Sequence, residues 1–400
     1  MGADARRLMS LEPVAATRLA IADLVSAAER QMGGMDFSIS PSLSRTLDLL
    51  RSLAAFLVVV NHVGEALFHF EDGLDLFNLF AFQLFYLGHQ GVMILFVVSG
   101  FLVGRAAMHC IAKSGQGMVD YAVDRMTRIY VVLIPALVIG FLSDQILAHV
   151  YSGPEFSYVK DRTDLLIFMG NLVGLQTMFV PTFGSNGPLW SLACELWYYL
   201  MFPTFLLVIF GKGLRVRLVA LVILSASLVT VSDVVLRYGV IWCLGLFCWL
   251  PRRRLAPKWV AWTLLVCCLA SANNEYLWSR GWGFTHIVAT ALCVALIINS
   301  CRHDQTISKA KAGAISKFFA KFTYSLYLYH YPPLMIVVAM TLKNNFVSYS
   351  HLGVTEAISA IGLLVLLYAY GFAFFWVTER HYHRVREFVR ARIAPLRLGF

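Results

Sequence analysis

Arg51 and His62 stand at matched positions within one apolar segment. If that segment is helical, eleven residues at 100° each return to within about 20° of the same face and advance about 16 Å. With Arg51 at the mouth of a membrane segment, His62 would lie near the middle of a hydrocarbon core about 30 Å thick. A neutral imidazole there is the form that a general base or an acyl acceptor needs. The spacing therefore predicts one helix face with a cation at its entrance and a titratable ring halfway along.

Two acidic residues accompany this pair, Asp48 one turn before Arg51 and Glu65 one turn after His62. Residues three apart share a helix face, so we predict that Asp48 and Glu65 orient or charge-balance their neighbours. The structural alternative is an arginine whose stem lies along apolar surface and a histidine hydrogen-bonded to another helix.

Two further polar residues, His330 and Glu195, interrupt apolar runs. His330 follows Lys321 by nine residues, about 13 Å along a helix, and the proline pair 332–333 weakens the helix just beyond it. Glu195 is expected about 10–12 Å from the outer end of its crossing. A carboxylate at that depth must be paired, protonated or facing water. We predict catalytic roles for both; the alternatives are a histidine satisfied by nearby tyrosines and a carboxylate that pairs with a buried Arg or His.

Arg125 and Arg128 lie just before another apolar run, on its basic side. Three residues apart on a helix, they share a face, and two guanidiniums there could bind phosphates in bidentate fashion. The alternative is the ordinary role of arginines beside a membrane, in topology or in contact with lipid headgroups.

The elements that must position these residues are membrane helices. The 400 residues are 59% hydrophobic and 14% charged, with mean hydropathy +0.69, whereas soluble chains carry roughly 25% charged residues. Backbone groups in lipid must pair internally, so each apolar run should be helical and the fold class is all-α. The runs fall at 50–70, 76–104, 129–150, 163–180, 188–210, 214–232, 235–250, 257–273, 283–300, 322–342 and 355–378.

The basic residues decide which runs cross. Lys and Arg gather on the cytoplasmic side of inserted proteins. Of the 33 here, 28 fall in six clusters: before 52, at 105–128, 212–217, 252–258 and 302–321, and after 379. If all six clusters are cytoplasmic, two crossings must separate each consecutive pair of clusters. Three apolar runs lie between residues 128 and 212, so one of them cannot span. We assign that role to 163–180 as a re-entrant or interfacial helix. The prediction is a polytopic protein with about ten transmembrane helices and both termini cytoplasmic. The run 76–104 should break near its glycines at 88 and 91.

Several classes are excluded by the same composition. The net charge of +10 follows the cytoplasmic clusters, which indicates topology and an anionic cytoplasmic ligand rather than nucleic acid. The eight cysteines form no C-x-x-C or Cys/His zinc spacing, so no metal is expected. Residues 1–44 form a cytoplasmic extension, in which 11–30 is a weak candidate for an amphipathic helix, and no cleavable signal peptide is expected. Residues 45–380 form the transmembrane domain, and 381–400 a basic cytoplasmic tail.

Five motifs in chain order resemble the acyltransferase-3 family of membrane-bound carbohydrate O-acyltransferases. The segment from Leu47 to His62 is similar to its opening D-G-x-R-G-x-A-A…H run with the R-x10-H spacing. Four further segments resemble its G-V-x-x-F-F-V-x-S-G-F-L, R-x-x-R, W-S-L-x-x-E and S-L-Y-L-x-H-x-P runs: 91–102, which contains Ser99, Arg125 with Arg128, 190–195 and 325–332. The resemblance covers about residues 45–380, in the stand-alone form without an SGNH-type domain.

The resemblance implies a membrane O-acyltransferase of the bacterial cytoplasmic (inner) membrane. Acetyl-CoA or another acyl-CoA would be the donor, with Arg51, Arg125 and Arg128 facing its phosphates and Ser99 in the same donor site. The acceptor would be a hydroxyl of a lipid-linked or extracytoplasmic glycan, entering near Glu195 and the loop 181–188. His62 would be the general base or a transient acyl carrier, with Glu195 and His330 positioning the acceptor or stabilising charge.

Two other classes compete with this interpretation. A multi-pass transporter or exporter of a small polar metabolite would also have about ten crossings, a broken helix and polar groups at the midplane. Against it, no inverted repeat is apparent, and a CoA donor explains the arginines better. A membrane sensor or assembly protein, whose polar groups are only structural, is the third possibility.

Overall fold

The computed structural model describes residues 37–70, 75–112, 117–151, 153, 156–251, 253–272, 283–304, 313–343 and 348–393, and they form helices without strands. The predicted extension 1–44 lies outside these ranges up to residue 36, as do 394–400 of the predicted tail. The elements are α2 (Pro41–Leu67), α3 (Leu76–Phe85), α4 (Gly88–Ala112), α5 (Gly117–Val150), α6 (Ser157–Lys160), α7 (Leu165–Leu172), α8 (Leu189–Phe210), α9 (Leu214–Thr230), α10 (Asp233–Phe247), α11 (Lys258–Ala270), α13 (Gly283–Arg302), α14 (Gly313–Ala320), α15 (Thr323–Tyr329), α16 (Tyr331–Lys343), α17 (Val354–Val377), the 3-10 turn η2 (Glu379–His381) and α18 (Tyr382–Ile393).

The all-α prediction is confirmed, but the count of ten crossings is not. Within the described ranges five helices are long and apolar enough to cross a membrane: α4, α5, α8, α13 and a continuous stretch from α17 through α18. The pair α9 and α10, bent by 118°, could supply a sixth. Others are shorter: α11 and α16 have 13 residues each, about 20 Å. Apolar runs alone did not indicate where the helices would stop or bend.

Two predicted interruptions appear where the sequence placed them. The run 76–104 divides into α3 and α4, which begins at Gly88. The run 322–342 divides at His330 into α15 and α16, and Pro332 and Pro333 fall in the first turn of α16, where a missing N–H is tolerated. The segment 163–180 contains only α7, whose eight residues span about 12 Å and cannot cross the bilayer as a helix.

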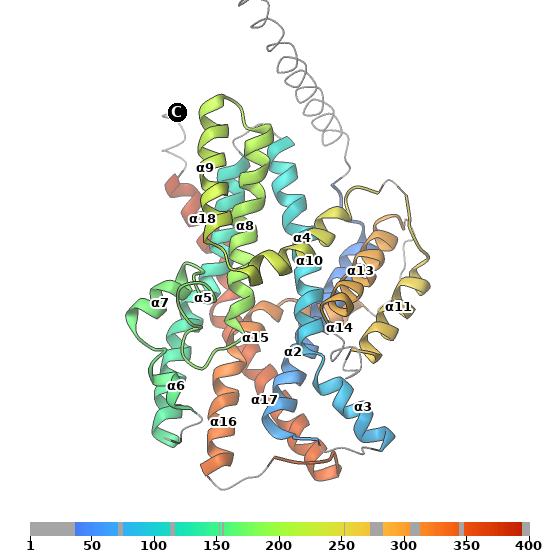
Figure 1. Ribbon diagram of the computed structural model, residues 1–400, viewed down its shortest axis with the longest axis vertical. Coiled ribbons are helices and arrows are strands. Elements are labelled where there is room, and N and C mark those ends of the chain that lie inside the picture. The colour runs from blue at the N-terminus through green and yellow to red at the C-terminus, as the bar shows by residue number, and fades with distance from the viewer. Residues whose placement is uncertain are drawn as a thin grey trace, which may run out of the picture.

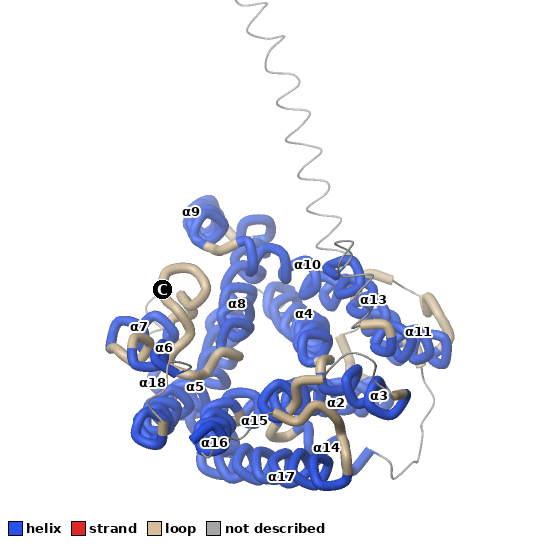
Figure 2. The backbone as a smooth tube through the Cα atoms, turned by 60° about the horizontal axis from the view of Figure 1, so that its bottom comes forward, coloured by secondary structure: helices blue, strands red, loops and turns tan. Residues whose placement is uncertain are grey.

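The long helices run mostly along the longest axis of the molecule, and the α8–α9 connection and α18 lie toward the same end (Figure 1). Viewed from the opposite end, α2, α4, α5, α8 and α15 surround the centre, with α17 against them and α11 and α13 at the periphery (Figure 2). The residues that bear the chemistry come from this central group.

Close backbone contacts fix the centre. A Cβ placed on Gly100 of α4 would lie 1.9 Å from the Trp242 carbonyl oxygen, and one on Gly245 of α10 would lie 1.9 Å from the Val97 carbonyl oxygen. Small residues on both helices thus permit direct backbone contact, as is common where membrane helices cross. The start of α2 is set by Ser40, whose side chain accepts a hydrogen bond from the Leu43 N–H at 3.2 Å. The glycine contacts hold α4 against α10, and the cap fixes where α2 begins, beside the cavity described next.

Candidate active site

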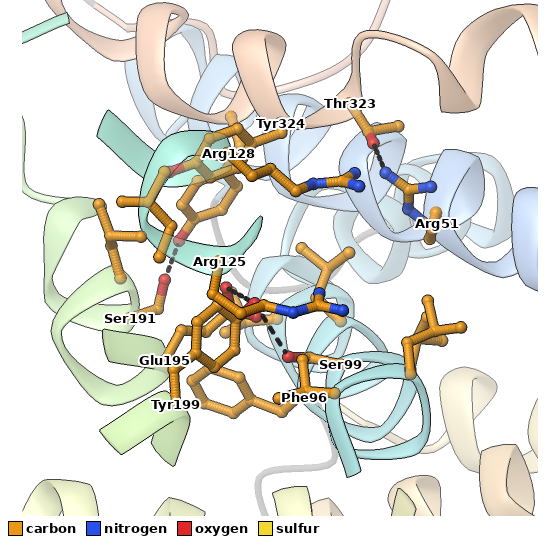
Figure 3. A pocket seen from close by; sticks show the side chains of 18 residues that line it. Arg51, Phe96, Ser99, Arg125, Arg128, Ser191, Glu195, Tyr199, Thr323 and Tyr324 are labelled. Carbon is orange, nitrogen blue, oxygen red and sulfur yellow. Dashed lines mark hydrogen bonds between the residues drawn. The ribbon is translucent and has the colours of Figure 1, made fainter. Parts of the chain in front are cut away.

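A cavity of about 160 Å³ lies between α2, α4, α5, α8 and α15 (Figure 3). Three predicted phosphate ligands, Arg51, Arg125 and Arg128, line it together with the predicted donor-site residue Ser99 and the predicted catalytic residue Glu195. We call it the arginine cavity. Its other polar lining residues are Ser191, Tyr199, Thr323, Tyr324 and Tyr327.

The three guanidiniums enter the cavity from two helices and extend toward the same space in Figure 3. Arg51 donates from Nη2 to Thr323 Oγ1 at 3.4 Å. Arg125 lies over the Tyr121 and Tyr199 rings, with its Cζ 5.8 and 6.0 Å from their centroids. Arg128 Cζ lies 5.9 Å from the Tyr382 ring centroid. Three cations gathered in one small cavity can bind an anion that is large enough to contact all of them.

Two donor groups in this cavity are buried and lack a hydrogen-bond partner among the described residues: Arg125 Nε and the Tyr324 hydroxyl. Native proteins rarely leave buried polar groups unpaired, so such groups mark places where a ligand or water completes the bonding. Two donors beside three cations favour a ligand that offers acceptor oxygens.

Glu195 forms the acidic side of the cavity. Its Oε2 accepts from the Tyr199 hydroxyl at 3.2 Å, and that hydroxyl lies 3.5 Å from Ser99 Oγ. Ser99 Oγ in turn accepts from Trp242 Nε1 at 3.3 Å. The sequence placed Glu195 toward the acceptor, beside the loop 181–188. The structure instead gathers it with the arginines, whose charges at 125 and 128 act on its carboxylate.

His62 and His330 form a second group outside the cavity lining. Their rings stack with centroids 5.3 Å apart and planes 26° apart, and the Tyr331 ring contacts His62 edge-on at 4.9 Å. Nδ1 of His62 lies 3.1 Å from Glu65 Oε2, so the carboxylate can hold the hydrogen on Nδ1 and leave Nε2 available as a base. Two residues far apart in the sequence are thus brought together, and the predicted contact of Glu65 with His62 is present.

The two groups meet at Tyr327. Its side chain lines the arginine cavity, and its ring centroid lies 6.1 Å from that of His330. Its hydroxyl contacts Ser191 Oγ at 2.6 Å and donates to the Pro188 carbonyl at 3.1 Å. One aromatic ring therefore lies between the cavity and the fully buried His330.

Comparison with known proteins identifies the family. The model of an acyltransferase domain, acyltransferase-3, matches residues 45–387. The chain belongs to the acyltransferase-3 family. This assignment supports an acyl-transferring enzyme over a transporter or a sensor.

Two relatives add detail about the similarity. The acyltransferase chain is 25% identical over 335 residues to "Putative peptidoglycan O-acetyltransferase YrhL" of Bacillus subtilis, which covers 72% of this chain and 48% of that protein. It is 28% identical over 137 residues to an uncharacterized protein of Haemophilus influenzae, covering 33% of this chain and 54% of that protein. The chain thus matches about half the length of each relative. No solved structure matches it.

Asp48, predicted to orient Arg51 in this acyltransferase, has no ion pair with it within 4 Å in the described part of the chain. Arg51 instead bonds Thr323, while the charges of Arg51 and Lys317 both act on the Asp48 carboxylate from a distance. One helical turn brings residues onto one face, but it does not fix where two side chains point.

Glu379 is the residue of this region that the sequence analysis missed. It is 6% exposed, and its Oε2 accepts from Ser325 N at 3.2 Å and from Ser325 Oγ at 2.7 Å. It thereby anchors the first turn of α15, the helix that ends at His330. The available signal was an acidic residue directly after the last apolar run, at the start of a basic tail.

Proposed function

We propose that this acyltransferase moves an acetyl or other acyl group from cytoplasmic acyl-CoA to a hydroxyl of an extracytoplasmic or lipid-linked glycan. The observation that carries the proposal is the meeting of three guanidiniums and two unpartnered donors in one cavity, on helices shared with His62 and His330. Acyl-CoA is a thioester whose CoA portion bears several phosphates, and a cavity with three guanidiniums suits these phosphates. The relative named as a peptidoglycan O-acetyltransferase supports a glycan acceptor.

The orientation in the membrane is part of the proposal. The α8–α9 connection, with its basic cluster at 212–217, and the arginine-rich α18 lie at the same end of the molecule (Figure 1). The positive-inside rule makes that end cytoplasmic. We propose about ten crossings with both termini on that side, in the bacterial inner membrane. Along α2, Arg51 and then His62 follow each other away from it, separated by about 16 Å.

The reaction that follows from this arrangement is an acyl transfer. His62 Nε2 takes the proton of the acceptor hydroxyl while the oxygen attacks the thioester carbonyl. A C–O bond forms, the C–S bond breaks, and the proton passes from the imidazolium to the departing CoA sulfur. Glu65 holds the ring and stabilises its charged form. A two-step alternative transfers the acyl group first to His62 and then to the hydroxyl, releasing CoA in the first step.

The test uses the purified full chain in lipid nanodiscs with radiolabelled acetyl-CoA and a neutral oligosaccharide, fully N-acetylated chitotetraose (below, chitotetraose). We expect release of free CoA together with a mass increase of one acetyl group on the sugar. Rapid quench would trap acetyl-histidine if the two-step route operates. In cells, mass spectrometry of surface polysaccharide with and without the gene should differ by one acetyl per modified sugar. The proposal is refuted if the wild-type chain binds neither acetyl-CoA nor CoA.

A further inference from the structure

A loop beside the histidine pair is fixed against a buried carboxylate. Asp144 of α5 is 2% exposed, and its two oxygens lie 3.3 and 3.2 Å from the main-chain nitrogen of Ser185. The preceding Gly184 has φ of +57°, and a Cβ there would lie 1.7 Å from Asp144 Oδ2. No other residue fits at this position, because both the backbone conformation and the space require glycine.

Two acceptor atoms beside this loop, Asn186 Oδ1 and His330 Nε2, are buried without a hydrogen-bond partner in the described part of the chain. The Ser185 side chain interacts with the Asp144 carboxylate, and its oxygen can still accept a further hydrogen bond. All three groups belong to one neighbourhood. Asn186 donates from Nδ2 to the Leu328 carbonyl at 3.0 Å, which places the loop beside the chain two residues before His330. Burying a polar group without a partner costs free energy, so two in one place indicate that something else completes their bonds.

The contacts already made show whether each free atom is a hydrogen-bond donor or an acceptor. The Asn186 amide group uses Nδ2 on a carbonyl, so its free atom is the acceptor Oδ1. His330 Nδ1 lies 3.0 and 2.9 Å from the Leu326 and Tyr327 carbonyl oxygens, which can only accept. Nδ1 therefore carries the hydrogen, and Nε2 of the neutral ring is an acceptor.

These acceptors select a class of ligand. The Asp144 carboxylate beside them has no ion pair in the described residues, and Arg162, whose carbonyl accepts from the Gly184 N–H at 2.8 Å, brings a cation to the same neighbourhood. The acceptors suit a neutral group that brings several O–H donors, such as the hydroxyls of a saccharide. A hydroxyl bound at His330 Nε2 would also lie next to the His62 ring, which stacks on His330 at 5.3 Å.

We infer that the loop 183–186, with Asp144 behind it and His330 beside it, is the subsite that holds the acceptor by its hydroxyls, and that Ser185 and Asn186 determine its specificity. This inference rests on the proposed function, because it assigns that reaction's acceptor to a place in the fold. Asp144 is a positioning residue here, since it acts through the loop that it holds.

The decisive variant is Ser185→Ala, because it removes an oxygen that can accept from a sugar hydroxyl while the main-chain bond of Ser185 to Asp144 stays. The matched control is Ser227→Ala, a buried serine of α9 whose hydroxyl bonds the Ile223 carbonyl. Binding of chitotetraose to the full chain in nanodiscs is measured without donor. We expect Kd to rise about five- to tenfold in Ser185→Ala, as loss of one hydrogen bond predicts, and to stay unchanged in the control. The unfolding temperature and Kd for CoA should stay unchanged in both variants.

A second experiment tests whether the subsite prefers a neutral sugar to an anionic one. A hyaluronan tetrasaccharide has the size of chitotetraose but carries carboxylates, and we expect the wild-type chain to bind it more weakly. The inference is overturned if Ser185→Ala binds chitotetraose like the wild type, if the anionic sugar binds more tightly, or if neither sugar binds and water alone fills the site. CoA binding is scored separately, so failure of the donor proposal and failure of this subsite give different results.

Discussion

Around the arginine cavity the unpartnered buried groups are donors, Arg125 Nε and the Tyr324 hydroxyl, whereas beside the histidine pair Asn186 Oδ1 and His330 Nε2 are acceptors. The first region collects positive charge, and the second is built on a buried carboxylate. A phosphate-bearing ligand and a hydroxyl-bearing ligand would therefore sort between the two regions without competing. An enzyme that joins two such substrates needs this separation, together with a short path between them.

One seven-residue helix, α15, supplies that path. Thr323 at its start bonds Arg51, and Tyr327 lines the cavity. The carbonyl of Leu328 binds the loop, and His330 caps its end. The comparison thus predicts that variants in one region change KM for one substrate, whereas loss of the contact that anchors the start of α15 changes KM for both.

The largest effect is expected for His62→Ala, which should lower the rate of acyl transfer about 10²- to 10⁴-fold because it removes the proposed base. Kd for CoA should not change, since His62 does not line the arginine cavity. The matched control is His69→Ala, an exposed histidine just beyond α2, which should retain full activity. The measurements are release of free CoA and equilibrium binding of CoA. If His62→Ala retains turnover, the histidine pair has no role in the reaction.

Arg128→Ala should act on the donor alone. Loss of a hydrogen bond to a charged group costs about 1.5–3 kcal/mol, so KM for acetyl-CoA should rise roughly 10- to 100-fold while KM for the sugar stays constant. The control is Arg237→Ala, an exposed arginine paired with Asp233. The rise should shrink at high salt and with a donor that lacks the 3′-phosphate. An equal rise in both KM values would show that the two regions are not separate.

Much of this arrangement was predictable from residue spacing. The common face of Arg51 and His62, the break at Gly88 and the interruption at His330 follow from helical periodicity, glycine and proline, which act locally. The count of crossings was not predictable, because the apolar runs reveal neither the 118° bend between α9 and α10 nor the shortness of α11 and α16. The sequence predicted Glu195 beside the acceptor, and in the structure its side chain lines the arginine cavity.

The roles of Asp144 and Glu379 were hidden for the same reason. Each carboxylate bonds the main chain of a residue far away in the sequence, Ser185 and Ser325 respectively. A main-chain partner leaves no signal in the partner's residue type. The local clues were the place of Glu379 directly after the last apolar run and Gly184, since glycine in an uncharged loop can mark a close approach.

Glu379→Ala should affect both regions, because it leaves Ser325 without its acceptor at the start of α15. We expect about 1–3 kcal/mol lower stability, the cost of leaving buried donors unsatisfied. Glu379→Gln keeps an acceptor oxygen and should lose less. The measurement is thermal unfolding in detergent, with KM for both substrates followed in parallel. An effect confined to one substrate would mean that α15 does not link the two regions.

Tyr327→Phe should give the smallest effect and the most specific one. The ring that separates the cavity from His330 stays, and only the hydroxyl that joins α15 to Ser191 and Pro188 of the α8 start is lost. One hydrogen bond is worth about 0.5–1.5 kcal/mol, so we expect kcat to fall by about tenfold or less. Neither KM should change, because the Tyr327 hydroxyl is already bonded to Ser191 and Pro188 and is not one of the unpartnered donors of the cavity. Tyr368→Phe, whose ring contacts Phe319 outside both regions, is the control. If instead one KM rises while kcat stays constant, Tyr327 belongs to a substrate-binding site. Another side chain would then have to separate the donor site from the acceptor site.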